Sequence, residues 1–296
     1  MRTTVATTIA SVRAQTWTDW ELIVIGQGQD DPVHPVVAAE SKGDRRIRYV
    51  NIPKRAVSPA RNAGLAAASG EIVAMTDDDS EARTDWLAVI AQSFESDSDL
   101  GVVGGAIFGG PRTWRRVSSN PSIVPGEVLY EPARARPPAP PGFDWYTGNF
   151  AIRREVARDL GPFDEFLGPG GLFLSCEDID YKLRAEAAGV KMLSTPRSVV
   201  FHTYGRRYGV RALAQTWHRN ETGSGAVAAK FTLRGDPRGR EWVEGRLREN
   251  TISLLRRPAP HRVLASPVRL QAFLRAYRRC LRDFELDARG LLTPKR

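Results

Sequence analysis

Three consecutive carboxylates, Asp77, Asp78 and Asp79, directly follow the apolar segment Glu71–Met75. That segment predicts a buried strand, and ligands in open α/β sheets bind beyond the carboxyl ends of the strands. Adjacent carboxylates repel one another unless a cation lies among them, and hard oxygen ligands favour Mg²⁺ or Mn²⁺. The position of the triplet therefore favours a metal site, which could hold a diphosphate, rather than a solvated turn.

A second acidic cluster, Glu177–Asp180, opens a predicted helix over residues 178–188. Asp178 and Asp180 are two residues apart, so their directions diverge by about 200° on a helix. One of them can therefore point into a cleft and accept a proton from a hydroxyl as a general base. Helix capping is the alternative, because negative charge is stabilised at a helix N-terminus.

His202, Arg61 and the pair Gly148-Asn149 are the remaining candidates. His202 follows the last predicted strand, and a neutral imidazole commonly joins carboxylates on Mn²⁺; a structural or surface histidine is the alternative. Arg61 lies in the predicted helix before the triplet, where it could clamp a phosphate or a base or simply be solvated. Gly148-Asn149 indicates either a close backbone approach or a plain turn.

Alternating strands and helices must position these residues. The predicted strands Glu21–Ile25, Arg46–Val50 and Glu71–Met75 are separated by helical segments, a pattern typical of βαβ units and a largely parallel sheet flanked by helices. We expect the three strands in one sheet, with the triplet at the carboxyl end of the last. The proline-rich segment 131–142 predicts an extended loop.

The charge divides the chain of 296 residues into two regions. Residues 1–200 carry 22 Lys and Arg against 26 Asp and Glu, a net charge of −4, whereas residues 201–296 carry 21 against 8, a net charge of +13. These regions predict a catalytic domain over 1–204 and a basic helical C-terminal region over 205–296. Two cysteines favour a reducing, cytoplasmic compartment, and no apolar run approaches the ~20 residues of a membrane span.

One helical stripe of apolar residues runs through the basic C-terminal region. It consists of Leu270, Phe273, Leu274, Tyr277, Leu281 and Phe284. Aromatics interleaved with basic residues would favour nucleic acid, but their helical spacing here favours a packed helix with a basic rim. We therefore expect no nucleic-acid partner. For the stripe itself, packing within the protein is favoured over a peripheral contact with the anionic inner face of a membrane.

Together, the ordered motifs resemble family 2 glycosyltransferases with the GT-A fold, over residues 11–204. The matching segments are Gln15-Thr16, Trp20–Val24, Ala60–Gly64, Ala68–Asp79, Thr147–Asn149, Arg153-Arg154, Leu160–Glu165, Glu177–Asp180 and His202. The resemblance implies an inverting, metal-dependent transfer of a sugar from a nucleotide diphosphate donor to an acceptor hydroxyl. The acceptor would be a saccharide, a lipid-linked molecule or a small molecule, as in polysaccharide biosynthesis.

The resemblance also implies a role for each candidate residue. Asp178 matches the catalytic base, while Asp77, Asp79 and His202 match the residues that hold Mn²⁺ or Mg²⁺. The expected nucleotide-binding residues are Arg61, Asp77 and Asp78. The expected acceptor-binding residues are Gly148, Asn149 and Glu177.

Two departures from the family pattern lie near the start of the chain. Family members usually begin with a strand that ends in a Pro-Thr-Tyr-Asn-like turn, whereas this sequence begins in the first helix. Gly26 stands where the family usually has an aspartate. We expect a gap or an irregular element beside Glu21–Ile25. A start of the sequence assigned too late explains the two departures better than a degraded copy of the gene does, since all the downstream catalytic residues are present.

Two other functions fit parts of this pattern. A sugar nucleotidyltransferase also uses a metal on a parallel sheet, but it would need a Gly-rich phosphate loop after the first strand, and we find none. An inactive, truncated homologue that acts as a binding module is the non-enzymatic alternative.

Overall fold

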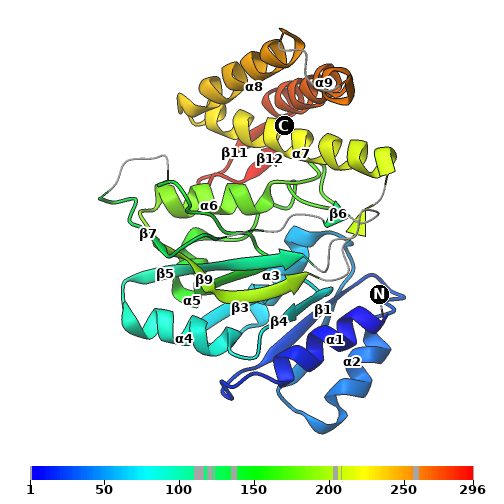
Figure 1. Cartoon of the computed structure of the whole chain (residues 1–296), viewed down its shortest axis with the longest axis vertical. Coiled ribbons are helices and arrows are strands. Elements are labelled where there is room, and N and C mark those ends of the chain that lie inside the picture. The colour runs from blue at the N-terminus through cyan, green and yellow to red at the C-terminus, as the bar shows by residue number, and fades with distance from the viewer. Residues whose placement is uncertain are drawn as a thin grey trace. The chain divides into compact units, whose positions relative to one another are not determined.

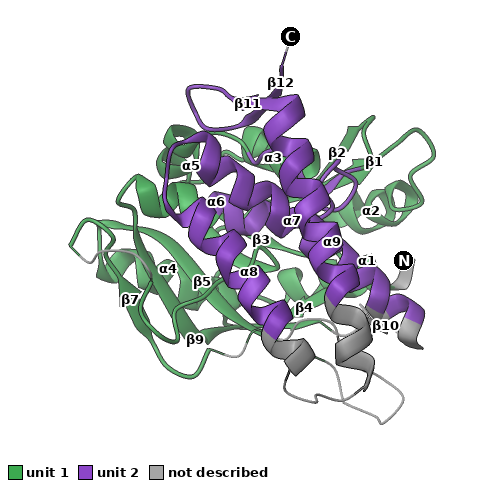
Figure 2. Ribbon diagram, turned by 90° about the horizontal axis from the view of Figure 1, so that it is seen from above, with its two compact units in different colours: residues 1–55, 59–162, 182–208 green, residues 56–58, 163–181, 209–296 purple. Residues whose placement is uncertain are grey.

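The computed structural model describes residues 2–109, 117–118, 122, 124–134, 139–202, 206–207, 209–255 and 260–295. The chain forms two compact units, shown in separate colours in Figure 2. Unit 1 comprises residues 1–55, 59–162 and 182–208, and unit 2 comprises residues 56–58, 163–181 and 209–296. Unit 2 thus combines the C-terminal region with two internal segments, and the domain boundary at residue 204 stays a prediction.

The start of unit 1 is a small α/β layer (Figure 1). Strands β1 (Leu22–Gln27) and β2 (Ile47–Ile52) pair in parallel. Helices α1 (Arg2–Arg13) and α2 (His34–Glu40) cover them, followed by the short 3₁₀ helix η1 (Ser41–Gly43). A core of Val5, Ile9, Val33, Val37 and Ile47 joins these elements. Among the described residues β1 pairs with no strand other than β2.

A second sheet of six strands forms the centre of unit 1, in the order β3–β8–β5–β9–β4, with β7 also on β9. Its strands are β3 (Ile72–Thr76), β4 (Ser80–Ala82), β5 (Leu100–Gly109), β7 (Val128–Tyr130), β8 (Asn149–Arg153) and β9 (Lys191–His202). Only the β5–β9 pair is parallel; β3–β8, β5–β8, β4–β9 and β7–β9 are antiparallel. The α/β class is confirmed, but the central sheet is mixed rather than largely parallel.

The expectation that the first three strands share one sheet was wrong. β3 pairs with β8, a strand that follows it by more than 70 residues, and not with β1 or β2. Apolar runs indicate that a strand is buried, but they do not identify its partner. Helix α4 (Trp86–Ser96) packs on this sheet through Trp86, Ile90 and Phe94.

Three shorter helices and a small strand pair complete the elements around this sheet. The helices are α3 (Val57–Ala67), α5 (Arg154–Leu160) and α6 (Glu177–Ala187), and the paired strands are β6 (Val117–Ser118) and β10 (Arg206–Arg207). Helices α3 and α6 each span a boundary between the two units. The helix predicted over residues 178–188 corresponds to α6, which begins and ends one residue earlier than predicted.

Unit 2 is largely helical, as expected of the C-terminal region. It contains α7 (Gly209–Leu233), α8 (Arg238–Leu255), α9 (Pro260–Asp283) and the hairpin β11 (Phe284–Leu286)–β12 (Leu292–Pro294). Helix α7 approaches α9 closely at Gly225, where an added Cβ would overlap the carbonyl oxygen of Phe273. Small residues at helix crossings let the backbones come together.

The predicted buried stripe on α9 is only partly correct. Phe273 is buried, and so is Phe284, which lies beyond the helix as the first residue of β11, but Leu270, Leu274, Tyr277 and Leu281 remain partly exposed. The closest packing of α9 instead uses the small side chains Ala272, Ala276 and Cys280 beside Phe273. The prediction considered only the largest apolar residues and therefore did not identify this face. Small residues determine where two helices can approach each other closely.

None of the helices in the described ranges is both long and apolar enough to span a bilayer.

Candidate metal and nucleotide site

The carboxylate triplet occupies the tight turn between β3 and β4. The N–H of Ser80 donates to the carbonyl oxygen of Asp77 at 3.2 Å. The hydroxyl of Thr8 on α1 lies 3.1 Å from the carbonyl oxygen of Asp78 and 2.7 Å from that of Ser80. The turn is therefore fixed by its own backbone and by a helix distant in sequence.

Strand pairing brings His202 to this turn. Ser80 on β4 lies opposite His202, the last residue of β9. Nε2 of His202 is 3.1 Å from Oδ1 of Asp79, and both side chains are partly buried. One donor atom from each of Asp77, Asp79 and His202 lies within 4.8 Å of the other two. The structure thus brings together the three residues expected to hold a metal.

Charge within the cluster changes the protonation of two groups. The hydrogen bond that His202 donates to Asp79 raises the pKa of His202, and the charges of Asp79 and Asp77 raise it further against the opposing effect of burial. Partial desolvation raises the pKa of Asp78, and the negative charges of Asp79 and Asp77 add to it. The negative charge of the cluster therefore favours the protonated form of His202 when no cation is bound.

The donor set fits a divalent cation. Two carboxylate oxygens and one imidazole nitrogen suit Mn²⁺, and the carboxylates also suit Mg²⁺. Like-charged carboxylates held this close are unfavourable without a counter-charge. The half-exposed side chain of Asp77 leaves the cluster accessible to a further ligand such as a phosphate.

Arg61 and Gly148 border the same cluster. The guanidinium of Arg61, on α3, lies 3.9 Å from Oδ1 of Asp77, and its side chain is only 14% exposed. A Cβ added at Gly148 would lie 2.9 Å from Oδ2 of Asp77, and the Gly148 carbonyl accepts from the Thr76 hydroxyl at 3.1 Å. The backbone thus passes directly beside the Asp77 carboxylate, and a side chain at position 148 would have to displace it.

Asn149 has a different place from the one expected for an acceptor-binding residue. Its amide group donates to the carbonyl oxygens of Ala106 and Ser198 at 2.9 and 3.0 Å. Its side-chain oxygen accepts from the Trp86 indole at 2.8 Å and from the Ser198 hydroxyl at 3.1 Å. All of its donors and acceptors are thus used inside unit 1, where it is 1% exposed and joins strands β5 and β9 to α4.

A carboxylate also lies at the carboxyl end of β1, where Gly26 has no side chain. The Asp31 carboxylate accepts from the Tyr49 hydroxyl at 2.8 Å and from the Gln27 N–H at 3.1 Å. A Cβ added at Gly26 would overlap both the Tyr49 hydroxyl and Asp31. Burial and the bond to Asp31 raise the pKa of Tyr49 to about 12. Asp31 therefore places a carboxylate next to position 26, which has none of its own.

The second acidic cluster belongs to unit 2. Asp178 is partly exposed, and its Oδ1 accepts from the Ile179 N–H at 2.8 Å. Glu177 is buried against Gly168, and Asp180 is buried in an ion pair with Lys230. Of the three carboxylates, Asp178 is the most accessible, which agrees with its expected separation from Asp180. Its role as the base, and that of Glu177 toward the acceptor, stay predictions.

Thr8 and Asp31 are the contributors that sequence reasoning missed. Thr8 reaches the triplet from a helix some 70 residues earlier, and a threonine within a helical segment gives no signal of such a contact. Asp31 stands in a turn-forming segment, where an aspartate usually serves the turn itself.

Comparisons with known proteins agree with this geometry. Residues 2–161, more than half of the chain, match glycosyl transferase family 2. A glucosyl-dolichyl phosphate glucuronosyltransferase of Haloferax volcanii is 26% identical over 177 residues, which cover 55% of this chain and 52% of that protein. A pre-mycofactocin glycosyltransferase of Mycobacterium tuberculosis is 28% identical over 181 residues, covering 59% of this chain and 34% of that protein. The chain thus spans about half or less of the length of these relatives.

A solved structure has the same overall fold. The mannosyltransferase PcManGT from Pyrobaculum calidifontis, in complex with GDP-Man and Mn²⁺, superposes with a TM-score of 0.57 over 95% of this chain and 84% of that one, at 14% identity. At this identity the likeness concerns the fold alone.

Proposed function

Because the chain belongs to glycosyl transferase family 2, we propose that it transfers a sugar from a nucleoside diphosphate donor to an acceptor hydroxyl with the help of a divalent metal. The observation that carries this proposal is the convergence of Asp77, Asp79 and His202 within 4.8 Å, with Arg61 beside Asp77. Such a cluster is what a diphosphate leaving group requires, since its developing charge must be neutralised.

Each residue of the cluster has a distinct part in the proposed reaction. Asp79 and His202 would hold the metal, with Asp77 as the third ligand. The metal, when bound, supplies the positive charge that stabilises the departing diphosphate. Arg61 is fixed near Asp77 and adds a second cation for the phosphates. Because Gly148 has no side chain, the backbone can lie directly beside the Asp77 carboxylate.

Asp178 is the proposed base. The acceptor hydroxyl must lose its proton as it attacks the anomeric carbon, and a carboxylate within hydrogen-bond reach can take it. The backbone just before α6 supports a functional role, because Cys176 has φ of +69°, the one positive φ at a residue other than glycine in the described ranges. Strained backbone of this kind concentrates at functional sites. Attack opposite the leaving diphosphate would invert the anomeric centre.

The donor and acceptor classes follow from the similar proteins. GDP-mannose is the first donor to test, since PcManGT was solved with GDP-Man and Mn²⁺. A lipid-phosphate-linked saccharide is the first acceptor class, since the Haloferax volcanii relative is named for a glucosyl-dolichyl phosphate. Asp31, at the end of β1, is a candidate acceptor of hydrogen bonds from the N–H groups of the donor's nucleobase.

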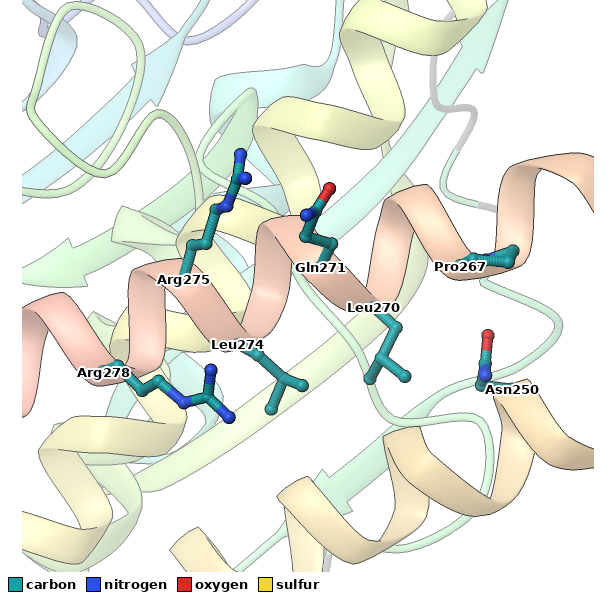
Figure 3. Close-up of a pocket in the computed structure, with 7 residues that line it drawn as sticks. All are labelled: Asn250, Pro267, Leu270, Gln271, Leu274, Arg275 and Arg278. Carbon is teal, nitrogen blue, oxygen red and sulfur yellow. The ribbon is translucent and has the colours of Figure 1, made fainter.

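A lipid-linked acceptor would place the enzyme at a membrane surface, and unit 2 offers a suitable face. A groove between α8 and α9 is lined by Asn250, Pro267, Leu270, Gln271, Leu274, Arg275 and Arg278 (Figure 3). Leu270 and Leu274 point toward α8, and Arg278 lies beside them. Leu247 on α8 is 44% exposed. Apolar side chains with arginines around them are typical of a peripheral contact with anionic lipid.

The metal part of the proposal is tested by thermal unfolding with MnCl₂ and GDP. We expect the melting temperature of the wild type to rise when both are present, because a ligand that binds only the folded state stabilises it. Asp79→Ala and His202→Ala should abolish most of that rise while the proteins remain folded. Asp99→Ala, which removes an exposed carboxylate of unit 1, is the control and should respond like the wild type.

If neither GDP nor UDP with MnCl₂ shifts the wild-type transition, the donor site is not functional in this chain, and the binding-module alternative replaces the enzymatic proposal.

A further inference from the structure

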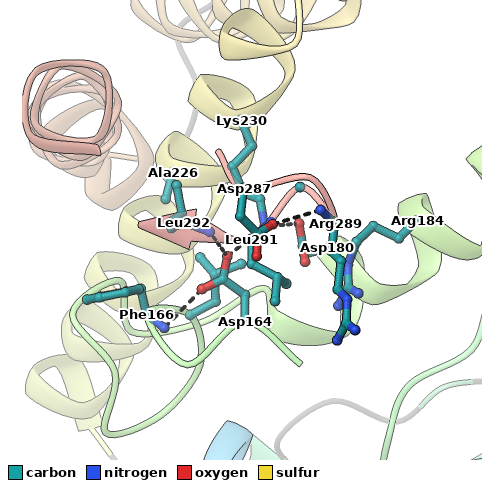
Figure 4. A network of polar contacts seen from close by, with 12 residues as sticks. Asp164, Phe166, Asp180, Arg184, Ala226, Lys230, Asp287, Arg289, Leu291 and Leu292 are labelled. Carbon is teal, nitrogen blue, oxygen red and sulfur yellow. Dashed lines mark hydrogen bonds and ion pairs between the residues drawn. The ribbon is translucent and has the colours of Figure 1, made fainter. Parts of the chain in front are cut away.

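Helix α7 carries a buried cation between two buried carboxylates (Figure 4). Nζ of Lys230 lies 2.7 Å from Oδ2 of Asp164 and 2.5 Å from Oδ1 of Asp180. The three side chains are at most 5% exposed. A buried charge is strongly unfavourable unless it is paired, so this cluster fixes its members to one another.

The cluster joins four segments of unit 2. Besides the lysine, Asp164 accepts from the N–H groups of Phe166 at 3.0 Å and Leu292 at 2.9 Å. The loop that contains Asp164, the first turn of α6, the last turn of α7 and strand β12 therefore meet at one point. Asp180 is the member that lies on α6, two residues after Asp178.

A second set of contacts ties α7 to the residues just before α6. At Gly223 an added Cβ would overlap the carbonyl oxygen of Ser175, so α7 and this loop touch through their backbones. Sγ of Cys176 lies 3.8 Å from the Ser224 hydroxyl. The positive φ of Cys176 is a conformation that persists only when its surroundings hold it.

From these contacts we infer that Lys230 is a positioning residue for the proposed base: through Asp180 it fixes the direction of the first turn of α6, and with it the carboxylate of Asp178. This inference rests on the proposed function of Asp178. Lys230 itself has no place at the reacting atoms, because it is buried on α7 and its charge is satisfied by Asp164 and Asp180.

The structure also provides a matched control. Glu221, a buried acid on α7, accepts two hydrogen bonds from Arg269 of α9 at 2.9 and 2.6 Å, and its other oxygen lies 3.4 Å from Arg246 of α8. Glu221→Gln weakens an ion cluster of the same unit. That cluster connects α7 to α8 and α9. This variant separates a general loss of stability from a change in α6.

The experiment compares Asp180→Asn, Glu221→Gln, Asp178→Asn and the double variant Asp178→Asn/Asp180→Asn in the full chain. Asp180→Asn keeps the shape of the side chain and leaves Lys230 paired with Asp164, so it should fold. Release of GDP from GDP-mannose, or of the nucleoside diphosphate from the best donor of a nucleotide-sugar panel, gives kcat and the donor KM. Each assay is run well below the melting temperature of the variant.

We expect Asp180→Asn to lower kcat roughly 10- to 100-fold, because a small misplacement of a reacting group has effects of this size, with a donor KM within about twofold of the wild type. Glu221→Gln should keep the wild-type kcat. In the Asp178→Asn background, Asp180→Asn should have no further effect, since the group that it positions is gone.

Three results would overturn the inference: an unchanged kcat in Asp180→Asn, an equal fall in Glu221→Gln, or a full further loss in the double variant. If Asp178→Asn alone turns over normally, the assignment of the base fails, and the positioning role fails with it. That result differs from a failure of positioning alone, in which Asp178→Asn is slow and Asp180→Asn is normal.

Discussion

At the scale of single residues, the contact between Asp79 and His202 is a place where a proton and a metal ion compete. A metal binds neutral imidazole, whereas the hydrogen bond to Asp79 stabilises the protonated form and raises the pKa of His202 above 6.5. The proton therefore contributes stability to the metal-free protein below pH 6.5, and this contribution is lost as the pH rises through the raised pKa.

Mn²⁺ affinity should consequently increase with pH through that raised pKa. Below it, each pH unit should change the dissociation constant by about tenfold, since one proton is displaced for each ion bound. Isothermal titration calorimetry with MnCl₂ over this pH range measures the effect. His202→Gln removes the titrating group, so its weaker binding should show a flatter pH dependence; equal slopes in the two proteins would contradict the assignment of His202 as a ligand.

Sequence reasoning was most successful for residues whose chemistry is locally visible. Asp77 and Asp79 follow a recognisable strand, and His202 ends another, so their proximity could be expected from the sheet. Asn149 could not be judged in this way, because its use as a buried crosslink depends on Trp86 and Ser198, which are brought to it only by the tertiary fold.

At the scale of secondary structure elements, helix α9 has two different faces. Its small residues pack closely, while Leu270 and Leu274 line an open groove with the arginines. Neither Arg275 nor Arg278 makes an ion pair with any described residue. Two unpaired cations beside partly exposed leucines favour attraction to an anionic surface.

Replacing both arginines, as Arg275→Gln/Arg278→Gln, should weaken binding to phosphatidylserine-containing vesicles by about 30-fold, at about 1 kcal/mol for each well-placed cation. Vesicle co-sedimentation measures this loss. The control variant Arg154→Gln/Arg158→Gln changes two exposed arginines of α5 in unit 1 and should bind like the wild type.

Binding of the wild type to neutral vesicles as strong as to anionic ones would show that the arginines do not drive the contact. No binding to either kind would remove the membrane surface from the proposal.

The strands show where local patterns stop being informative. β1, β2 and β3 were predicted correctly as strands, yet the distribution of strands between two sheets was not. Partner choice depends on β8, which arrives between β3 and β5 from much later in the chain. The mixed directions of the sheet follow from that insertion and have no signature in any one segment.

At the scale of the whole molecule, the chain divides its tasks between two compact units. The residues that would hold the metal and the diphosphate belong to unit 1, and the buried lysine cluster and the basic helices belong to unit 2. Binding in unit 1 should therefore be seen first as local stabilisation there.

Hydrogen exchange with and without MnCl₂ and GDP tests this division. We expect slower exchange in residues 72–82 and 198–202, because the ligands would hold the turn after β3 against the end of β9. Exchange in α8 and α9 should change little. Protection that is confined to α8 and α9 would mean that the nucleotide binds to the basic helices instead.

The pairing of Ser80 with His202 has a consequence for how the site comes into existence. Asp79 and His202 are distant along the chain, and the chain between them must close into a long loop before β9 can lie beside β4. Closing so long a loop is entropically costly and slows the formation of such contacts. The complete donor set therefore exists only after the central sheet has closed, and a partly folded or newly synthesised chain lacks it. A metal held as proposed by all three residues would therefore bind the finished domain and not the growing chain.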